Sequence, residues 1–75
     1  MSTQQPQEYR ERVELVSPFQ IRIVSYKLDG TYHCTVDNVD PGAVVARAEG
    51  KTKVEAEERA IARAKERLQR TRIMN

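Results

Sequence analysis

A helix-start signal near the middle of this chain constrains its fold more than any other feature. Thr52 supplies a hydroxyl that can accept a hydrogen bond from a free amide in the first helical turn. Glu55, three positions later, can reach back to the amide of Thr52, which completes a capping box. The first helical residue is then Lys53, and we predict one long C-terminal helix over residues 53–70.

The predicted helix carries one apolar stripe that consists mostly of alanine. Its members recur at i, i+4 and i+7, which places them on one side of the helix. They are Val54, Ala56, Ala60, Ile61, Ala64 and Leu68. Because alanine side chains are short, we expect this helix to lie very close to the surface that supports it.

Alternation of apolar and polar residues upstream of the helix predicts three strands, over residues 19–28, 31–37 and 43–49. Asp29-Gly30 favours a tight hairpin between the first two strands, and the turn-forming residues of 37–42 favour a longer reversal. The buried side of the third strand would be Val44, Ala46 and Ala48. The predicted fold is α+β, a three-stranded antiparallel sheet with the helix packed on one face.

The N-terminal part of the chain is less well determined. Residues 1–8 are rich in Ser, Thr, Gln and Pro and are expected to form a disordered tail, which leaves residues 9–72 as a single domain. Tyr9, Val13 and Val16 fit a helical stripe, whereas Val13 and Leu15 fit a strand. A short helix is the preferred interpretation of this segment, and the strand stays open as the alternative.

Charge is unevenly distributed along the chain. Residues 1–50 contain five basic and seven acidic side chains, a net charge of −2, and residues 51–75 contain eight and four, a net charge of +4. Lys51 and Lys53 flank the helix start, where cations oppose the helix dipole. The basic side chains of the later helix have two interpretations, stabilisation of the helix end or contact with phosphates.

The helix start resembles the C-terminal signature of the double-stranded-RNA-binding domain. The matching residues are Gly50, Thr52, Lys53, Ala56, Glu57, Ala60 and Ala64. In that family, lysines at the helix start contact phosphates, and a loop between the first two strands enters the minor groove. The resemblance implies a phosphate contact for Lys53 and a loop formed by Gly30 and His33. Val54 and Thr31 stand where the family has its second lysine and its loop proline.

The same region also resembles the HicB-like antitoxin family, in which three strands precede a helix that opens with Gly-x-Thr-x-x-Glu-Ala. Gly50, Thr52, Glu55 and Ala56 match that opening, and residues 32–36 with the later Pro-Gly resemble its second strand and turn. The arm-binding domains of phage integrases are similar in element order. These resemblances imply a fold more than a function.

No group of residues in the sequence is typical of a catalytic site. His33 and Cys34 are adjacent on a predicted strand, so their side chains should point to opposite faces and cannot act together. Asp29, Asp37 and Asp40 fit turn formation better than a cation site. We therefore expect no enzymatic activity, no metal and no cofactor. The chain also lacks a run of apolar residues long enough for a membrane span, so we expect a cytoplasmic location and no membrane partner.

The sequence thus favours a non-enzymatic nucleic-acid-binding module that contacts a duplex backbone through the helix. The expected contact residues are Lys51, Lys53, Arg59, Arg63, Arg67 and His33. The alternative is a protein-interaction or antitoxin-like module that uses the uncovered sheet face. Because the core of so short a chain is small, we also expect a homodimer, with Val24, Tyr26 and Val45 in its interface.

Overall fold

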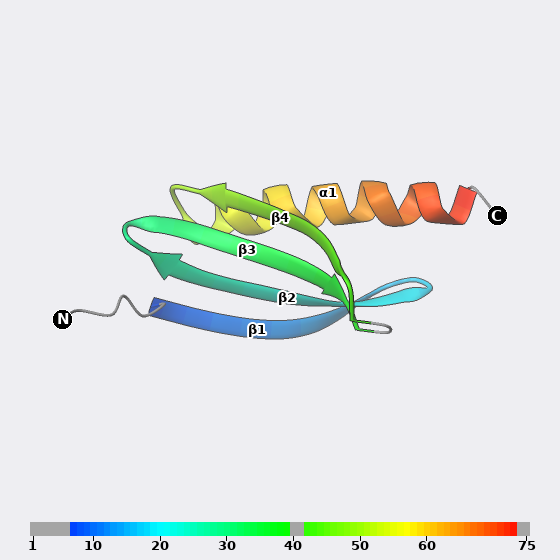
Figure 1. The fold of residues 1–75 in the computed structure, drawn as a ribbon, viewed down its shortest axis with the longest axis horizontal. Coiled ribbons are helices and arrows are strands. Elements are labelled where there is room, and N and C mark those ends of the chain that lie inside the picture. The colour runs from blue at the N-terminus through cyan, green and yellow to red at the C-terminus, as the bar shows by residue number, and fades with distance from the viewer. Residues whose placement is uncertain (1–6, 40–41, 74–75) are drawn as a thin grey trace.

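The computed structural model describes residues 7–39 and 42–73, with side chains described up to residue 70. The fold is α+β, and one C-terminal helix packs on an antiparallel sheet, as predicted (Figure 1). The sheet has four strands rather than the predicted three. The elements are β1 (Gln7–Val16), β2 (Phe19–Leu28), β3 (Thr31–Asn38), β4 (Val44–Gly50) and α1 (Lys53–Ile73).

The additional strand is β1, so the short helix preferred for residues 9–16 is wrong. β1 pairs with β2 across a two-residue turn, from Val16 opposite Phe19 to Arg10 opposite Ser25. The Ser17–Pro18 peptide bond in this turn is cis. β1 includes Gln7 and Glu8, which were expected in the N-terminal tail, and residues 1–6 lie outside the described part of the chain. Backbone pairing with β2 outweighs the weak helical spacing of the segment.

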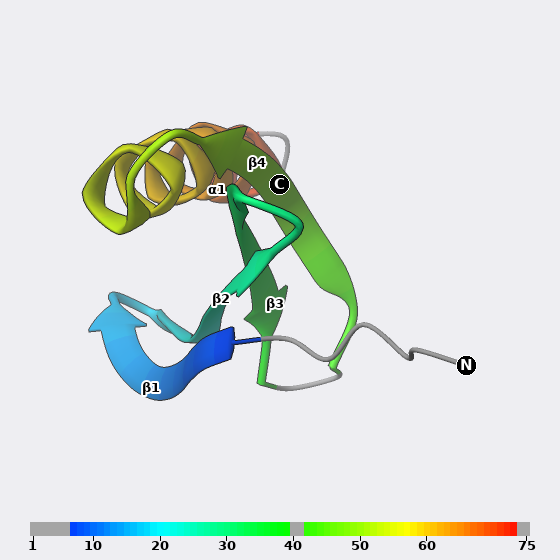
Figure 2. The same cartoon turned by 90° about the vertical axis from the view of Figure 1, so that its left-hand side faces the viewer.

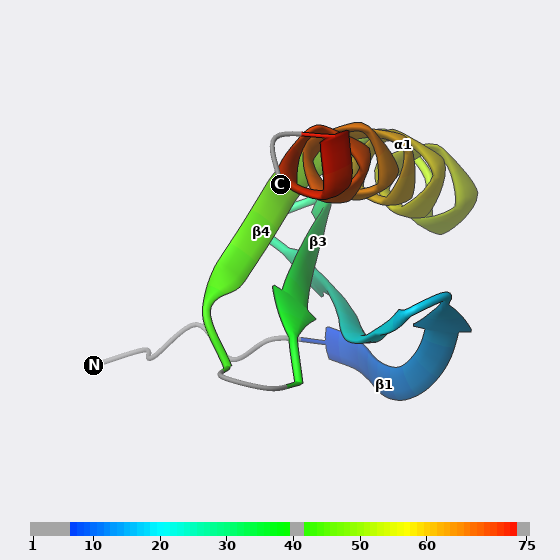
Figure 3. The same ribbon diagram turned by 90° about the vertical axis from the view of Figure 1, so that its right-hand side faces the viewer.

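The strands lie in their chain order, β1-β2-β3-β4, and every neighbouring pair is antiparallel. Figures 2 and 3 show a strongly curled sheet with α1 along its β4 side and β1 at the far edge. The β2–β3 connection is the predicted tight turn, and Asp29 and Gly30 both have positive φ, 54° and 80°. The side of the sheet that α1 does not cover is called the open face below.

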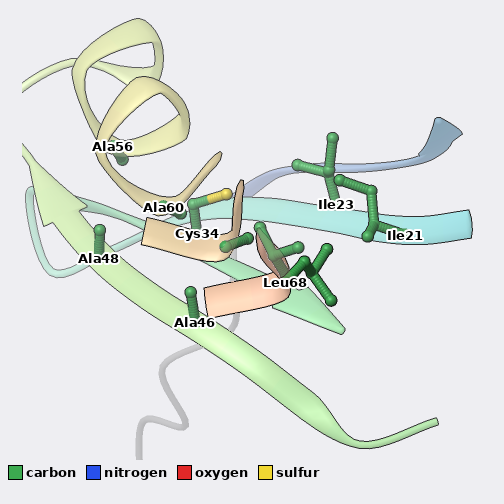
Figure 4. Close-up of a cluster of buried hydrophobic side chains, with 10 residues drawn as sticks. Ile21, Ile23, Cys34, Ala46, Ala48, Ala56, Ala60 and Leu68 are labelled. Carbon is green, nitrogen blue, oxygen red and sulfur yellow. The ribbon is translucent and has the colours of Figure 1, made fainter. Parts of the chain in front are cut away.

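The core lies between the alanine stripe of α1 and the inner residues of β2, β3 and β4 (Figure 4). Ala56, Ala60 and Ala64 are completely buried, as the apolar stripe predicts. The sheet side of this core consists of Ile21, Ile23, Cys34, Val36, Ala46 and Ala48. Large side chains come from β2 and small ones from β4, so α1 can lie closest to the β4 edge.

One residue of the predicted inner side of β4 does not belong to the core. Ala46 and Ala48 are buried as predicted, but Val44 is 51% exposed. The register shifts between Val36 and Asp37, where the pairing changes from Val36 with Ala46 to Asp37 with Val44. This irregularity moves Val44 off the inner side, because an extra residue reverses the direction of the side chains that follow it.

The helix start follows the capping prediction with one change. The Thr52 hydroxyl accepts a hydrogen bond from the Glu55 amide at 3.1 Å, whereas the Glu55 carboxylate accepts one from the amide of Lys51, at 2.7 Å, and not from Thr52. Gly50 makes this compact turn possible, because a Cβ atom there would lie 2.7 Å from the nitrogen of Ala56.

Thr52→Ala is expected to lower the free energy of unfolding by about 1 kcal/mol, because the Glu55 amide loses its hydroxyl acceptor. Thr52→Ser is the matched control, since it keeps the hydroxyl and should retain most of the stability. Urea denaturation followed by circular dichroism measures both. Equal stability of the alanine and serine variants would contradict the role of the hydroxyl.

Candidate nucleic-acid interface

Three arginines of α1, spaced four residues apart, donate hydrogen bonds to backbone carbonyls on the free edge of β4. The pairs are Arg59 Nη1 with the Glu49 carbonyl at 3.0 Å, Arg63 Nη1 with the Arg47 carbonyl at 2.7 Å, and Arg67 Nη1 with the Val45 carbonyl. We call these three side chains the arginine row. These side chains connect α1 to β4 and are also part of the protein surface.

The regularity of the arginine row follows from the geometry of a helix beside a strand. Four residues advance about 6 Å along an α-helix, and two residues advance about 6.7 Å along a strand. Each step of four along α1 therefore matches a step of two along β4, with the two elements running in opposite directions. Flexible arginine side chains absorb the small remaining difference.

The carbonyl contacts of the arginine row satisfy hydrogen bonds and do not themselves neutralise charge. A carbonyl oxygen accepts one of the five N–H donors of a guanidinium and carries no net charge itself. Arg59 has a carboxylate partner, Glu55, at 3.5 Å. Among the described residues, no carboxylate lies within ion-pair distance of Arg63 or of the neighbouring Arg47. In this part of the chain, Arg47 and Arg63 therefore carry positive charge without an ion-pair partner at the β4 edge, beside the carboxylates of Glu49 and Glu55.

A concavity of about 750 Å³ opens beside this edge, on the open face of β2, β3 and β4. Arg47, Arg59 and Arg63 line it together with Tyr26, His33 and one carboxylate, Glu49. The rings of Tyr26 and His33 are stacked, with centroids 5.2 Å apart and planes 18° from parallel. The concavity thus combines guanidinium groups with aromatic side chains, the combination found at surfaces that bind nucleic-acid backbones and bases.

The structure brings together half of the six residues predicted to contact nucleic acid. His33, Arg59 and Arg63 share the concavity, and Arg67 lies next along the arginine row. Lys51 and Lys53 lie at the start of α1, where Lys51 is exposed and Lys53 is half-buried. Arg47 was not among the predicted contacts. Its position beside Arg63 depends on the packing of α1 against β4, which no local sequence pattern reports.

The residues predicted for a dimer interface occupy two different environments. Val24 and Tyr26 lie half-buried on the open face, since their neighbours Ile23 and Ser25 point into the core. Val45 packs against the border of the core cluster.

A second polar cluster ties the far strand to the helix. Glu57 of α1 accepts hydrogen bonds at 3.0 Å from Arg12 of β1 and at 3.0 Å from the hydroxyl of Ser25, which is buried in β2. Arg12 also pairs with Glu14 at 2.7 Å. The hydrogen bond to Glu14, with that to Glu57, raises the pKa of Arg12 above its ordinary value. Because every member has a partner, we interpret this cluster as structural.

His33 and Cys34 point to opposite faces of β3, as predicted. His33 lies on the open face, with Nδ1 3.5 Å from a Glu49 oxygen, whereas Cys34 is in the core. Burial raises the pKa of the Cys34 thiol to about 11, so the thiol is protonated and a poor nucleophile at neutral pH. Cys34 is a core residue in this fold.

Among the described residues, no group of three histidine, cysteine or acidic side chains has an arrangement that would hold a metal ion. In the same part of the chain, α1 is not apolar enough to cross a membrane. The sequence matches no protein-family model, and comparisons with curated proteins and with solved structures find no match. The geometry of the arginine row and its concavity is therefore the main guide to function.

Glu57→Ala is expected to lower the free energy of unfolding by about 2 to 3 kcal/mol, because it removes two charged hydrogen bonds and leaves the buried Ser25 hydroxyl without an acceptor. Glu58→Ala is the matched control, since Glu58 is exposed and makes no hydrogen bond among the described residues. Equal losses in chemical denaturation would contradict the structural role of the cluster.

The stability contributed by the protonated Cys34 thiol should disappear in alkaline solution. The unfolded thiol ionises near pH 8.5 and the folded one near 11, so the unfolded state loses its proton first and stability falls across this interval. Urea midpoints at pH 7 and pH 10 should therefore differ more for the natural chain than for Cys34→Ala. Parallel decreases in the two proteins would show that Cys34 does not cause the change.

Proposed function

We propose that this chain is a non-enzymatic nucleic-acid-binding module that contacts the phosphate backbone through the arginine row and Arg47. The observation that carries the proposal is the alignment of Arg59, Arg63 and Arg67 along one edge, each held by a backbone carbonyl. Arg63 has no carboxylate partner among the described residues, so its guanidinium keeps its charge and most of its donors. Arginine suits phosphate because its planar donors match two phosphate oxygens at once.

The dimensions of the arginine row support a backbone ligand. Its members advance by about 6 Å along α1, close to the roughly 6.8 Å rise of two nucleotides along one strand of a duplex. Their hydrogen bonds to β4 also fix the side chains before a ligand arrives. Less side-chain entropy is then lost on binding, which favours affinity.

The proposed contacts recognise the charge of the phosphate backbone rather than the base sequence of the nucleic acid. Phosphate contacts position a protein on a nucleic acid and carry no base information. Tyr26 and His33, stacked in the same concavity, offer a flat surface for a base from an unpaired strand. Because the arginine row contacts only phosphates, we expect weak, salt-dependent binding to many sequences, with a duplex as the principal ligand and an unpaired base at its end or in a loop as an additional contact.

The location proposed for this activity is the cytoplasm. Cys34 is a free, buried cysteine, and the described chain contains no disulfide. This is compatible with a reducing compartment. The second candidate function, a protein-interaction or antitoxin-like role for the open face, is favoured by the half-buried Val24 and Tyr26 on that face.

Fluorescence anisotropy with double-stranded RNA and DNA tests the proposal. We expect micromolar dissociation constants at low salt and a linear fall of log K with log salt, by about 0.9 per phosphate contacted on DNA. Arg47→Gln combined with Arg63→Gln should weaken binding to every sequence alike and lower the magnitude of that slope. The single variant Arg47→Gln tests the charge of Arg47 without disturbing the fold, because no hydrogen bond within the described chain involves its side chain.

The matched control is Lys65→Gln with Arg70→Gln, which removes the same charge from α1 away from the β4 edge. Lys65 lines a small hollow with Val16 and Phe19, and Arg70 is 72% exposed beside Glu66. If the two double variants lose affinity equally, net charge rather than the arginine row is responsible. Absence of binding to every nucleic acid at low salt would favour the protein-interaction function.

A further inference from the structure

The two edge strands of the sheet, β1 and β4, differ in whether their outward backbone groups are hydrogen-bonded. On β4, the arginine row occupies the carbonyls that point away from β3. On β1, no described residue hydrogen-bonds to the backbone groups that point away from β2. An unpaired strand edge is a template for another strand, and natural sheets usually cover or disrupt such edges.

The register fixes which backbone groups of β1 point outward. Along each strand, the backbone N–H and C=O groups of successive residues point alternately to the two neighbouring sides. The carbonyls of β4 that point away from β3 therefore fix, through the register of each pair, which residues of β3, β2 and β1 hydrogen-bond to which neighbour. The alternation places the N–H and C=O groups of Glu11, Val13 and Leu15 on the outer edge of β1. The backbone N–H and C=O groups that point toward β2 belong to Arg10, Arg12, Glu14 and Val16.

β1 also carries the largest share of exposed apolar side chains. Five large apolar residues in the described chain are more than half exposed, and three of them are Tyr9 at 58%, Val13 at 53% and Leu15 at 69%. Val13 and Leu15 lie on the open face opposite Arg22 and Gln20 of β2. An apolar row beside unpaired backbone groups indicates a contact surface.

We propose that the outer edge of β1 pairs antiparallel with β1 of a second copy of this chain, with Val13 on the two-fold axis. In this register Arg12 lies opposite the partner's Glu14, and Glu14 opposite the partner's Arg12. Val13 faces the partner's Val13, and Leu15 lies opposite the partner's Glu11 and diagonally beside the partner's Val13. Two opposite-charge pairs and one apolar pair then form across the axis.

The neighbouring registers are less favourable, and this selects the proposed one. Backbone alternation allows the partner to slide only by two residues, which moves the axis by one. An axis at Arg12 places the two Arg12 side chains opposite each other, and an axis at Glu14 does the same for two carboxylates. An axis at Glu11 sets Arg10 against Arg12. An axis at Leu15 also avoids like charges, but it overlaps only Glu14–Val16 and sets Glu14 against Val16. The Val13 axis is the one that pairs the whole of Arg10–Val16, the span that lies beyond the register shift at the start of β1, without like charges.

The resulting dimer joins two four-stranded sheets into one of eight strands and leaves both arginine rows at the outer edges. It therefore uses β1 rather than Val24 and Tyr26 at the centre of the open face. Edge pairing adds backbone hydrogen bonds and buries Val13 and Leu15, which the small core of each copy leaves exposed.

Cysteine cross-linking tests the register. Directly opposite residues of an antiparallel pair have Cα atoms about 4.5 to 5.5 Å apart, within the range that a disulfide spans. Val13→Cys should give a covalent dimer on mild oxidation. Val44→Cys is the matched control, because Val44 is equally exposed, at 51%, but lies on β4. Equal cross-linking of the two variants would overturn the proposal.

Sedimentation equilibrium from about 1 to 200 µM chain tests the assembly itself. The natural chain should dimerise, whereas Val13→Pro and Glu14→Arg should each be monomeric, the first because it removes an outward N–H and the second because it faces the partner's Arg12. Circular dichroism verifies that each variant is folded. If Val13→Pro is unfolded, Glu14→Arg alone tests the interface. Tyr26→Glu should remain dimeric. A monomeric natural chain, or a dimer lost only in Tyr26→Glu, would refute the β1 interface.

Discussion

The close approach of α1 to β4 is the contact on which the rest of this structure depends. Ala56, Ala60 and Ala64 lie against Ala46 and Ala48, so only methyl groups separate the helix from the strand. Larger side chains at these positions would move α1 outward, because protein interiors have little free volume. At this short separation the arginine row reaches the carbonyls of β4. Core packing and surface chemistry are therefore set by the same residues.

The arginine row combines two properties that are usually separate. By occupying the outward carbonyls of β4, it removes the acceptors that an additional strand would need, which protects this edge from unwanted pairing. Through Arg63, which has no carboxylate partner among the described residues, it also makes the same edge attractive to anions. Lysine would be a poor substitute, since its single ammonium group lacks the forked donors that can serve a carbonyl and a phosphate together.

Local signals in the sequence predicted the helix start, the β2–β3 turn and three strands, because capping and alternation depend on residues close together in the chain. For β1 a strand was only the alternative to a short helix, because the charged residues of this segment hide its alternation. Arg12 points toward the helix side and is satisfied by Glu57, 45 positions away. The hydrogen bonds of the arginine row could not be predicted from the sequence either, since the contact of Arg63 with the Arg47 carbonyl exists only after α1 packs on β4. A weak local pattern limited the prediction of β1, and distance along the chain limited the prediction of the arginine row.

The uneven charge of the chain acquires a spatial meaning once both sheet edges are known. The acidic excess of residues 1–50 includes Glu11 and Glu14 on β1, where carboxylates alternate with arginines and can pair with a second copy in one register. The basic excess of residues 51–75 lies partly on the side of α1 that faces β4, where the hydrogen-bond acceptors are neutral carbonyls. Alternating charge favours self-association, whereas unbalanced charge favours a polyanion. Because the two patterns occupy opposite edges of one sheet, assembly through β1 leaves the arginine row accessible.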